Sequence, residues 1–306
     1  ASSSFCCLEK RESEREDRAQ SASLGPTSVL RIPAPGGGPL EEMDLGMISV
    51  AFFVLGLMVG SFLNVCIWRL PAEEQVIRGR SHCRRCLRTI PWVDNVPLVS
   101  FLLLKGKCRF CGTPISWVYP AVELATGLLF LSLWWRFGLT GISTIYAVLG
   151  AALILVSVID ARQMILPDEV TLPGLQLGVI LSFFFPILHG VTDRWAGLWS
   201  SVLGAVVGAS FLWIVGTIGS WVFKKEAMGG GDVKLMAFVG SVIGMPKVLL
   251  VNLILAPLLG SVVGLVLKFR YKQELIPYGP FLALGTLVAI FWGDGILAWY
   301  RSLFAG

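Results

Sequence analysis

Charge is scarce in this sequence. Asp, Glu, Lys and Arg make up only 15% of the 306 residues, whereas hydrophobic residues make up 55%. A soluble domain of this length has about a quarter of its residues charged, so the composition argues against a soluble enzyme. The net charge of +5 is weak support for nucleic-acid binding, because excess Lys and Arg in a membrane protein usually serve topology. We therefore expect a lipid bilayer, and no nucleic acid, around this chain.

Long apolar runs recur from Leu45 onward, and many have the length of about 20 residues that crosses a bilayer as a helix. The sequence predicts an all-α polytopic membrane protein with about eight transmembrane helices. The sixth is short and lies between a glycine run and Gly-Met-Pro, so it is predicted to be broken or tilted. The expected helices are 45–68, 118–137, 141–160, 170–188, 196–223, 233–245, 247–268 and 278–299.

The N-terminal 42 residues do not share this pattern. They are charged, have no apolar stripe and run into Pro-Ala-Pro-Gly-Gly-Gly-Pro. We expect residues 1–42 to be a disordered or non-native extension. The remaining chain is predicted to comprise a first transmembrane helix (43–69), a polar insert (70–117) and a helical membrane core (118–306).

The distribution of basic residues predicts the orientation. One set of connections, on the side of the polar insert, holds most of the Lys and Arg beyond residue 42. The other set holds Arg136, Arg194, Lys247 and Arg301. Positive charge marks the cytoplasmic side of a membrane protein, so the insert and the glycine run are predicted to face the cytoplasm.

The insert carries two Cys-x-x-Cys pairs, Cys83 with Cys86 and Cys108 with Cys111. Each pair can form a tight knuckle, and the chain between them can fold back so that four thiolates surround one zinc ion. Two disulfides or a redox pair are the alternative, which a cytoplasmic location disfavours. With four protein ligands the zinc is predicted to be structural, and it would stabilise a small segment that has little core.

Two carboxylates are placed at the ends of apolar runs on the predicted cytoplasmic side. Asp160 ends the run Ala-Leu-Ile-Leu-Val-Ser-Val-Ile-Asp, and Asp232 opens the sixth helix. Acids at matching depth on different helices can converge, and like-charge repulsion then makes the pair share one proton. One acid can act as general base toward water and the other as general acid, as in aspartic proteases.

The glycine run before Asp232 is predicted to serve substrate approach. Gly229, Gly230 and Gly231 carry no side-chain bulk, so a substrate backbone can come close to the acid, and Lys234 follows on the helix. The alternative is an ordinary N-cap aspartate after a flexible turn. A phosphate-binding loop is disfavoured, because no strand precedes the glycines and no Gly-Lys-Ser/Thr follows.

Taken together, the motifs resemble those of the type IV prepilin peptidases, also called leader peptidase/N-methyltransferases. The resemblance spans residues 45–299, and the family is similar to archaeal preflagellin peptidases and more distantly to presenilin. It is carried by GSFLNVCIWRLP (60–71), by the cysteine pairs with residues 93–124, by IDARQMILPDEVTLP (159–173), by GGGDVKLM (229–236) and by IPYGPFLALG (276–285).

The resemblance implies that Asp160 and Asp232 are the catalytic pair of an intramembrane aspartic endopeptidase. Asp168 matches a further family motif, and its expected role is to cap the fourth helix. The implied substrates are type IV prepilins or pseudopilins, cleaved after the basic leader at the cytoplasmic face of the bacterial inner membrane.

The resemblance also implies N-methylation of the new amino terminus with S-adenosylmethionine as methyl donor. That activity is associated with the insert and with GSFLNVCIWRLP, in which Gly60, Asn64 and Arg69 are the candidate residues. One departure is that Arg84 and Arg85 stand inside the first cysteine pair, where the family often has proline.

Two other functions stay open at this stage. Buried acids near glycine breaks also occur in proton-coupled transporters, but this chain has no obvious internal repeat and its acids gather at one face. A methyltransferase alone, with both aspartates as structural caps, is the other alternative.

Overall fold

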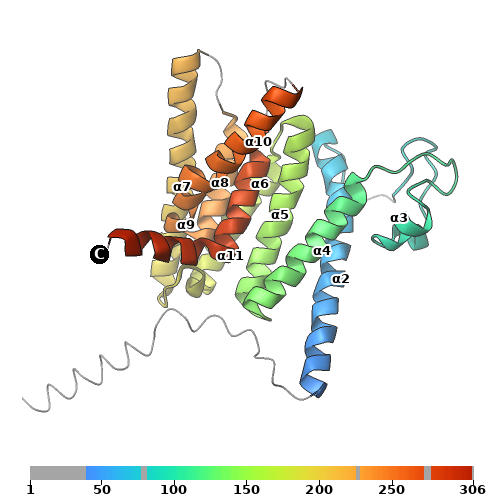
Figure 1. The fold of residues 1–306 in the computed structure, drawn as a ribbon, viewed down its shortest axis with the longest axis horizontal. Coiled ribbons are helices and arrows are strands. Elements are labelled where there is room, and N and C mark those ends of the chain that lie inside the picture. The colour runs from blue at the N-terminus through green and yellow to red at the C-terminus, as the bar shows by residue number, and fades with distance from the viewer. Residues whose placement is uncertain (1–38, 77–80, 225–227, 272–276, 305–306) are drawn as a thin grey trace, which may run out of the picture.

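The computed structural model describes residues 39–76, 81–224, 228–271 and 277–304, so the predicted extension 1–42 lies almost entirely outside it. These residues form helices and no strand; two isolated β-bridges lie in the insert. The all-α prediction is therefore confirmed. Figure 1 shows a bundle of long helices with the insert projecting from one side.

The long helices follow the apolar runs of the sequence. Short helical turns lie in the insert and between the long elements. The long helices are α2 (Pro39–Arg69), α4 (Val118–Phe137), α5 (Gly141–Gln163), α6 (Asp168–Phe184), α7 (Arg194–Phe223), α8 (Gly230–Ile243), α10 (Ala256–Tyr271) and α11 (Gly279–Phe304). The short elements are the turns Leu70–Ala72, Trp92–Asn95 and Pro186–His189, with α3 (Val99–Leu103) and α9 (Met245–Leu250).

Within the described residues, six helical stretches are long and apolar enough to cross a membrane. The predicted number of eight transmembrane helices is not confirmed, because α6 has 17 residues and α8 only 14. The short sixth helix was expected, and it ends at Gly244, whose φ of 79° breaks the helix before α9. A π-helical turn at Val251–Leu255 then joins α9 to α10.

Much of the outer surface is apolar, as a lipid environment requires. Trp213 and Trp221 on α7 are 62% and 82% exposed, and Trp292 on α11 is 63% exposed. A soluble monomer rarely exposes so many large apolar side chains together. The chain is thus a polytopic membrane protein in composition, in length of its helices and in surface.

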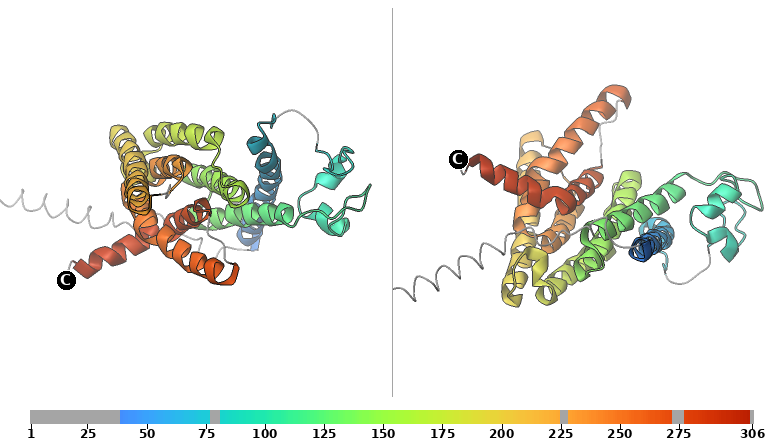
Figure 2. Two further views of the ribbon diagram at one scale, coloured as in Figure 1. Left: turned by 90° about the horizontal axis from the view of Figure 1, so that it is seen from above. Right: turned by 60° about the horizontal axis from the view of Figure 1, so that its bottom comes forward.

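Helix α5 joins the two parts of the bundle (Figure 2). One of its faces, with Leu149 and Leu153, belongs to the buried cluster formed with α8 and α11. Another face, with Leu155 and Ile159, packs in a second cluster with α2 and α4. The C-terminal end of α5, which carries Asp160, is consequently held from both sides.

Glycines set the closest helix contacts. A Cβ atom at Gly204 on α7 would lie 2.2 Å from the backbone oxygen of Gly240 on α8, and the reverse distance is 2.1 Å. On α2, a Cβ atom at Gly60 would lie 2.7 Å from the Cα atom of Glu123 on α4. Small residues at such crossings allow the backbones to approach, as is common in membrane helices.

We expect Gly204→Ala to lower the free energy of unfolding by about 1–3 kcal/mol, because the added methyl group forces α7 and α8 apart. Unfolding of the purified protein in detergent measures this. Gly46→Ala on α2 is the control, since no atom lies within 4 Å of its added Cβ. Equal stability of the two variants would show that the contact tolerates the methyl group.

Candidate active site and metal centre

Asp160 lies in the last turn of α5 and is only 6% exposed. Its Oδ2 atom accepts a hydrogen bond of 2.9 Å from the backbone N–H of Gly279, the first residue of α11. A Cβ atom at position 279 would lie 2.7 Å from that oxygen, so only glycine allows this approach. The N-terminus of α11 also provides a favourable dipole for a carboxylate that stands at the unfavourable end of its own helix.

Asp232 lies in the first turn of α8 and is 7% exposed. Its Oδ1 atom is buried and has no hydrogen-bond partner among the described residues. The charge of Asp160 acts on Asp232, and the charge of Asp232 acts on Tyr278, which directly precedes α11. The structure therefore brings the two predicted acids together at the start of a third helix.

This arrangement has a definite chemical capacity. Two buried carboxyl groups that feel each other's charge favour a state in which they hold one proton between them. An unpaired oxygen on Asp232 leaves a hydrogen-bonding position for water or substrate. The pair can then accept a proton from a water molecule and donate one to a carbonyl oxygen.

The glycine run differs in part from the prediction. Gly229 is the N-cap of α8 and Gly230 has open space around it, as substrate approach requires. Gly231 instead lies inside the helix, and its added Cβ would be 2.7 Å from the Cβ of Leu166. Its lack of a side chain is needed for packing between α8 and the segment before α6.

Lys234 and Asp168, two residues singled out in the sequence, form an ion pair with Nζ–Oδ distances of 2.7 Å. Asp168 is therefore not a helix cap: Pro167 is the N-cap of α6 and no side chain caps that helix. The pair joins the starts of α6 and α8, and it orients the helix that carries Asp232.

The four cysteines of the insert gather as predicted. Their sulfur atoms all lie within 4.8 Å of one another, and the Cys83 and Cys111 sulfurs are 3.8 Å apart. A tetrahedron with metal–sulfur bonds of about 2.3 Å has sulfur–sulfur edges of about 3.8 Å. None of the four is in a disulfide. The donor set and its spacing fit one tetrahedral metal ion.

The two cysteine pairs adopt the same backbone geometry. Leu87 N–H donates to the carbonyl oxygen of Cys83, and Gly112 N–H donates to that of Cys108. The donor residue has a left-handed φ in both turns, 56° at Leu87 and 68° at Gly112. Backbone N–H groups in the first turn lower the pKa of the Cys83 thiol, and Thr113 lowers that of Cys111 to about 6. Both effects favour the thiolate that binds metal. Cys86 differs: a backbone hydrogen bond at Arg88 acts to lower its pKa, but desolvation and the neighbouring Cys83 and Cys111 sulfurs raise it to about 11.

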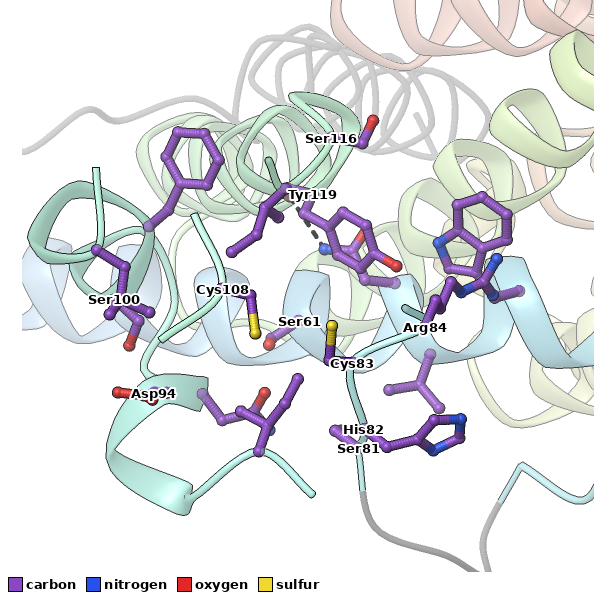
Figure 3. A pocket seen from close by; sticks show the side chains of 18 of the residues that line it. Ser61, Ser81, His82, Cys83, Arg84, Asp94, Ser100, Cys108, Ser116 and Tyr119 are labelled. Atoms are coloured by element: carbon purple, nitrogen blue, oxygen red, sulfur yellow. Dashed lines mark hydrogen bonds between the residues drawn. The ribbon is translucent and has the colours of Figure 1, made fainter. Parts of the chain in front are cut away.

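The candidate methyltransferase residues lie beside the insert rather than at the two aspartates. Gly60 is a helix-contact glycine against α4, and Arg69 donates to the backbone oxygens of Gln75 and Val76. Asn64 is 3% exposed and donates to the backbone oxygen of Tyr119. Asn64 and Arg69 line a cavity of about 850 Å³ between α2, α4 and the insert (Figure 3).

Sequence reasoning missed two residues that lie at the candidate sites. Gly279 lies in the motif IPYGPFLALG, and no role was predicted for it. A Tyr-Gly-Pro sequence before an apolar run nevertheless indicates the start of a helix. Glu123 lies within the expected helix 118–137, where no local pattern sets it apart. It is 8% exposed, lines the cavity and accepts a 2.9 Å hydrogen bond from Leu98 N–H.

Comparisons with known proteins give a consistent result. The model of the type IV leader peptidase family matches residues 147–266, and that of the bacterial peptidase A24 N-terminal domain matches residues 54–137. The chain is 38% identical to the prepilin leader peptidase/N-methyltransferase of Pseudomonas putida, over 80% of this chain and 91% of that protein. It is 40% identical to the protein of that name in Myxococcus xanthus, over 72% of this chain and 63% of that protein. No solved structure matches the chain.

A salt bridge between Arg109 and Asp94 lies within the insert. Arg109 Nε lies 2.7 Å from Asp94 Oδ2, and the guanidinium lowers the pKa of Asp94. The pair therefore stabilises the insert above the usual aspartate pKa, and the contribution is lost as pH falls through the lowered value. We expect Asp94→Asn to speed amide exchange across residues 81–117 at pH 7. Exchange equal to that of the wild type would contradict a stabilising role.

Proposed function

The chain belongs to the type IV leader peptidase family, and from that premise we propose that it cleaves the basic leader from type IV prepilins or pseudopilins. Asp160 and Asp232 activate the water that attacks the peptide bond. The enzyme then methylates the new amino terminus. The observation that carries the proteolytic part is the meeting of two buried acids from different helices at the start of α11.

The reaction follows from the shared proton of the pair. The ionised carboxylate takes a proton from water, and the resulting hydroxide attacks the carbonyl carbon of the scissile bond. The protonated carboxyl group donates to the carbonyl oxygen as the tetrahedral intermediate forms. Return of a proton to the amide nitrogen then breaks the C–N bond. The Gly279 N–H supports this sequence by fixing one oxygen of Asp160.

The substrate reaches the aspartate pair at the start of α8. A helical substrate hides its amide groups in internal hydrogen bonds, so the scissile segment must be extended before cleavage. Gly229 and Gly230 are exposed and without close neighbours other than Asp232, so an extended backbone can pass beside them. Gly231 packs against Leu166, and Lys234 pairs with Asp168. These two contacts hold the first turn of α8 in place.

We place the pair at the cytoplasmic face of the bacterial inner membrane. Basic residues on the connections of that side support this orientation. The insert, with its exposed arginines, then lies in the cytoplasm as well. Prepilin leaders are basic and reach the enzyme from that compartment.

The metal of the insert is proposed to be zinc with a structural role. Cys83, Cys86, Cys108 and Cys111 fill all four positions of a tetrahedron, which leaves none for a catalytic water. S-adenosylmethionine supplies the methyl group for the second activity. Two of the three candidate methyltransferase residues, Asn64 and Arg69, line the cavity beside the insert.

The aspartate pair is tested by substitution. Asp160→Asn and Asp232→Asn should each lower the rate of prepilin cleavage by about three orders of magnitude, because the amide can neither accept nor donate the required proton. Gel analysis of a prepilin incubated with each purified variant gives the rate. Asp193→Asn is the matched control, since Asp193 caps α7 and an asparagine retains the cap. Substantial cleavage by either pair variant would refute the proposed mechanism.

The metal is tested separately. Protein purified without chelator should contain one zinc ion per chain, and Cys111→Ser should lose it. Amide exchange in residues 81–117 should then rise while α5 and α8 stay protected, because the insert has little core of its own. Cys66→Ala, outside the cluster, should keep the metal. Elemental analysis that finds no zinc in the wild type would contradict the assignment of a zinc site.

A further inference from the structure

The short helix α3 of the insert turns its apolar side outward. Val99, Leu102 and Leu103 are 51%, 73% and 77% exposed. Their i, i+3, i+4 spacing places them on one side of the helix, and this set is named the α3 face. Ser100 is instead buried, and its hydroxyl donates to the backbone oxygen of Val93. A helix in contact with water has the opposite arrangement, so the α3 face is suited to an apolar environment.

An aromatic residue connects the α3 face with the surface of α4. Trp117 directly precedes α4 and is 76% exposed, and its ring packs against that of Phe101 on α3 with centroids 4.9 Å apart. Leu124 and Leu128 are exposed on α4, and their spacing from Trp117 places all three on one side of that helix. The exposed apolar surface thus runs from α3 onto a helix that can cross the membrane.

A hydrogen bond fixes the depth of α3 relative to the bundle. The backbone N–H of Leu98, the residue before α3, donates to Oε2 of Glu123 at 2.9 Å. Glu123 is the sixth residue of α4, so it lies about 8 Å along that helix from its start. The 20 residues of α4 are about as long as the hydrocarbon core is thick, about 30 Å. Helix α3 therefore begins beside the membrane segment, and Figures 1 and 2 show the insert beside the bundle rather than over its end.

The insert is also strongly basic. Residues 81–117 contain six Lys and Arg but one acid, Asp94. Asp94 pairs with Arg109, and the other five basic side chains form no ion pair within the part of the chain that the structure describes. Lys105 and Lys107 follow α3 within four residues, and both are exposed. Basic residues beside an exposed apolar face are typical of segments that bind a surface of anionic lipids.

We propose that the α3 face docks on the cytoplasmic leaflet of the bilayer. Its apolar side chains enter the boundary between headgroups and acyl chains, and Lys105 and Lys107 contact the phosphates of anionic lipids. Charge favours this occupant over a protein, because a second copy carries the same basic insert and a prepilin leader is basic as well. The inference goes beyond the proposed reaction and uses only the proposed orientation of the insert.

Photo-crosslinking tests the contact with lipid. p-Benzoylphenylalanine replaces Leu103 in the full chain, reconstituted in liposomes of phosphatidylglycerol and phosphatidylcholine. Illumination should attach a phospholipid to the peptide that carries the label, as measured by mass spectrometry. The same replacement at Glu74 is the matched control, because Glu74 is exposed beyond the end of α2 and should form no lipid adduct.

Each outcome of the crosslinking decides the proposal. A lipid adduct at position 103 and none at position 74 supports it. No lipid adduct at position 103, or equal adducts at both positions, overturns it. A crosslink from position 103 to a second copy of the chain, or to a prepilin added to the liposomes, would give the α3 face a protein partner and overturns it as well.

Amide exchange tests the role of charge with the α3 face unaltered. Residues 99–107 of the wild type should exchange more slowly in nanodiscs that contain phosphatidylglycerol than in phosphatidylcholine alone. The expected difference is at least about fivefold, because each lysine near an anionic surface strengthens binding by roughly that factor. Joint replacement by Lys105→Gln and Lys107→Gln should remove the difference. Lys224→Gln, at an exposed lysine that ends α7, should keep it. Equal exchange of the wild type in both lipids, or a difference that survives the loss of both lysines, would overturn docking on anionic lipid.

Discussion

The hydrogen bond from Gly279 N–H to Asp160 is the constraint on which the candidate active site depends. It joins residues 119 positions apart and holds the N-terminus of α11 against Asp160. A carboxylate in an apolar bundle needs such a partner, because an unpaired charge there is strongly unfavourable. The Asp168–Lys234 ion pair fixes α8 at the same end of the bundle. Together these contacts let two acids stay buried near one another, and no ion pair with a basic residue neutralises either of them among the residues that the structure describes.

Much of this site could be predicted from the sequence. Asp160 and Asp232 each end or begin an apolar run, so their depth followed from helix length alone. The four cysteines were predictable because their spacing already defines the two turns, and the structure confirms that they converge. Helix bounds for α4 and α5 agree closely with the apolar pattern. The division of the chain into extension, first helix, insert and core stays a prediction.

The remaining features depend on contacts that no local pattern contains. Asp168 looked like a helix cap, but Pro167 occupies that position and Asp168 pairs with a lysine 66 residues away. Gly231 was expected to serve substrate approach with the rest of the glycine run, yet Leu166 packs so close to it that a side chain would not fit. The cavity at the insert could not be predicted from a local pattern either, because its residues Arg84, Trp68 and Arg162 come from separate segments. Composition predicted a membrane protein, whereas the contacts of these residues depend on the tertiary structure.

The most direct test of the paired-acid account is the pH dependence of single-turnover prepilin cleavage by the purified enzyme. The account predicts a bell-shaped profile, because one carboxyl group must be ionised while the other is protonated. Gly279→Ala should lower the maximum on the order of a hundredfold, since its Cβ would displace the Asp160 carboxylate. A rate that rises steadily into the alkaline range, unaffected by Gly279→Ala, would contradict the account.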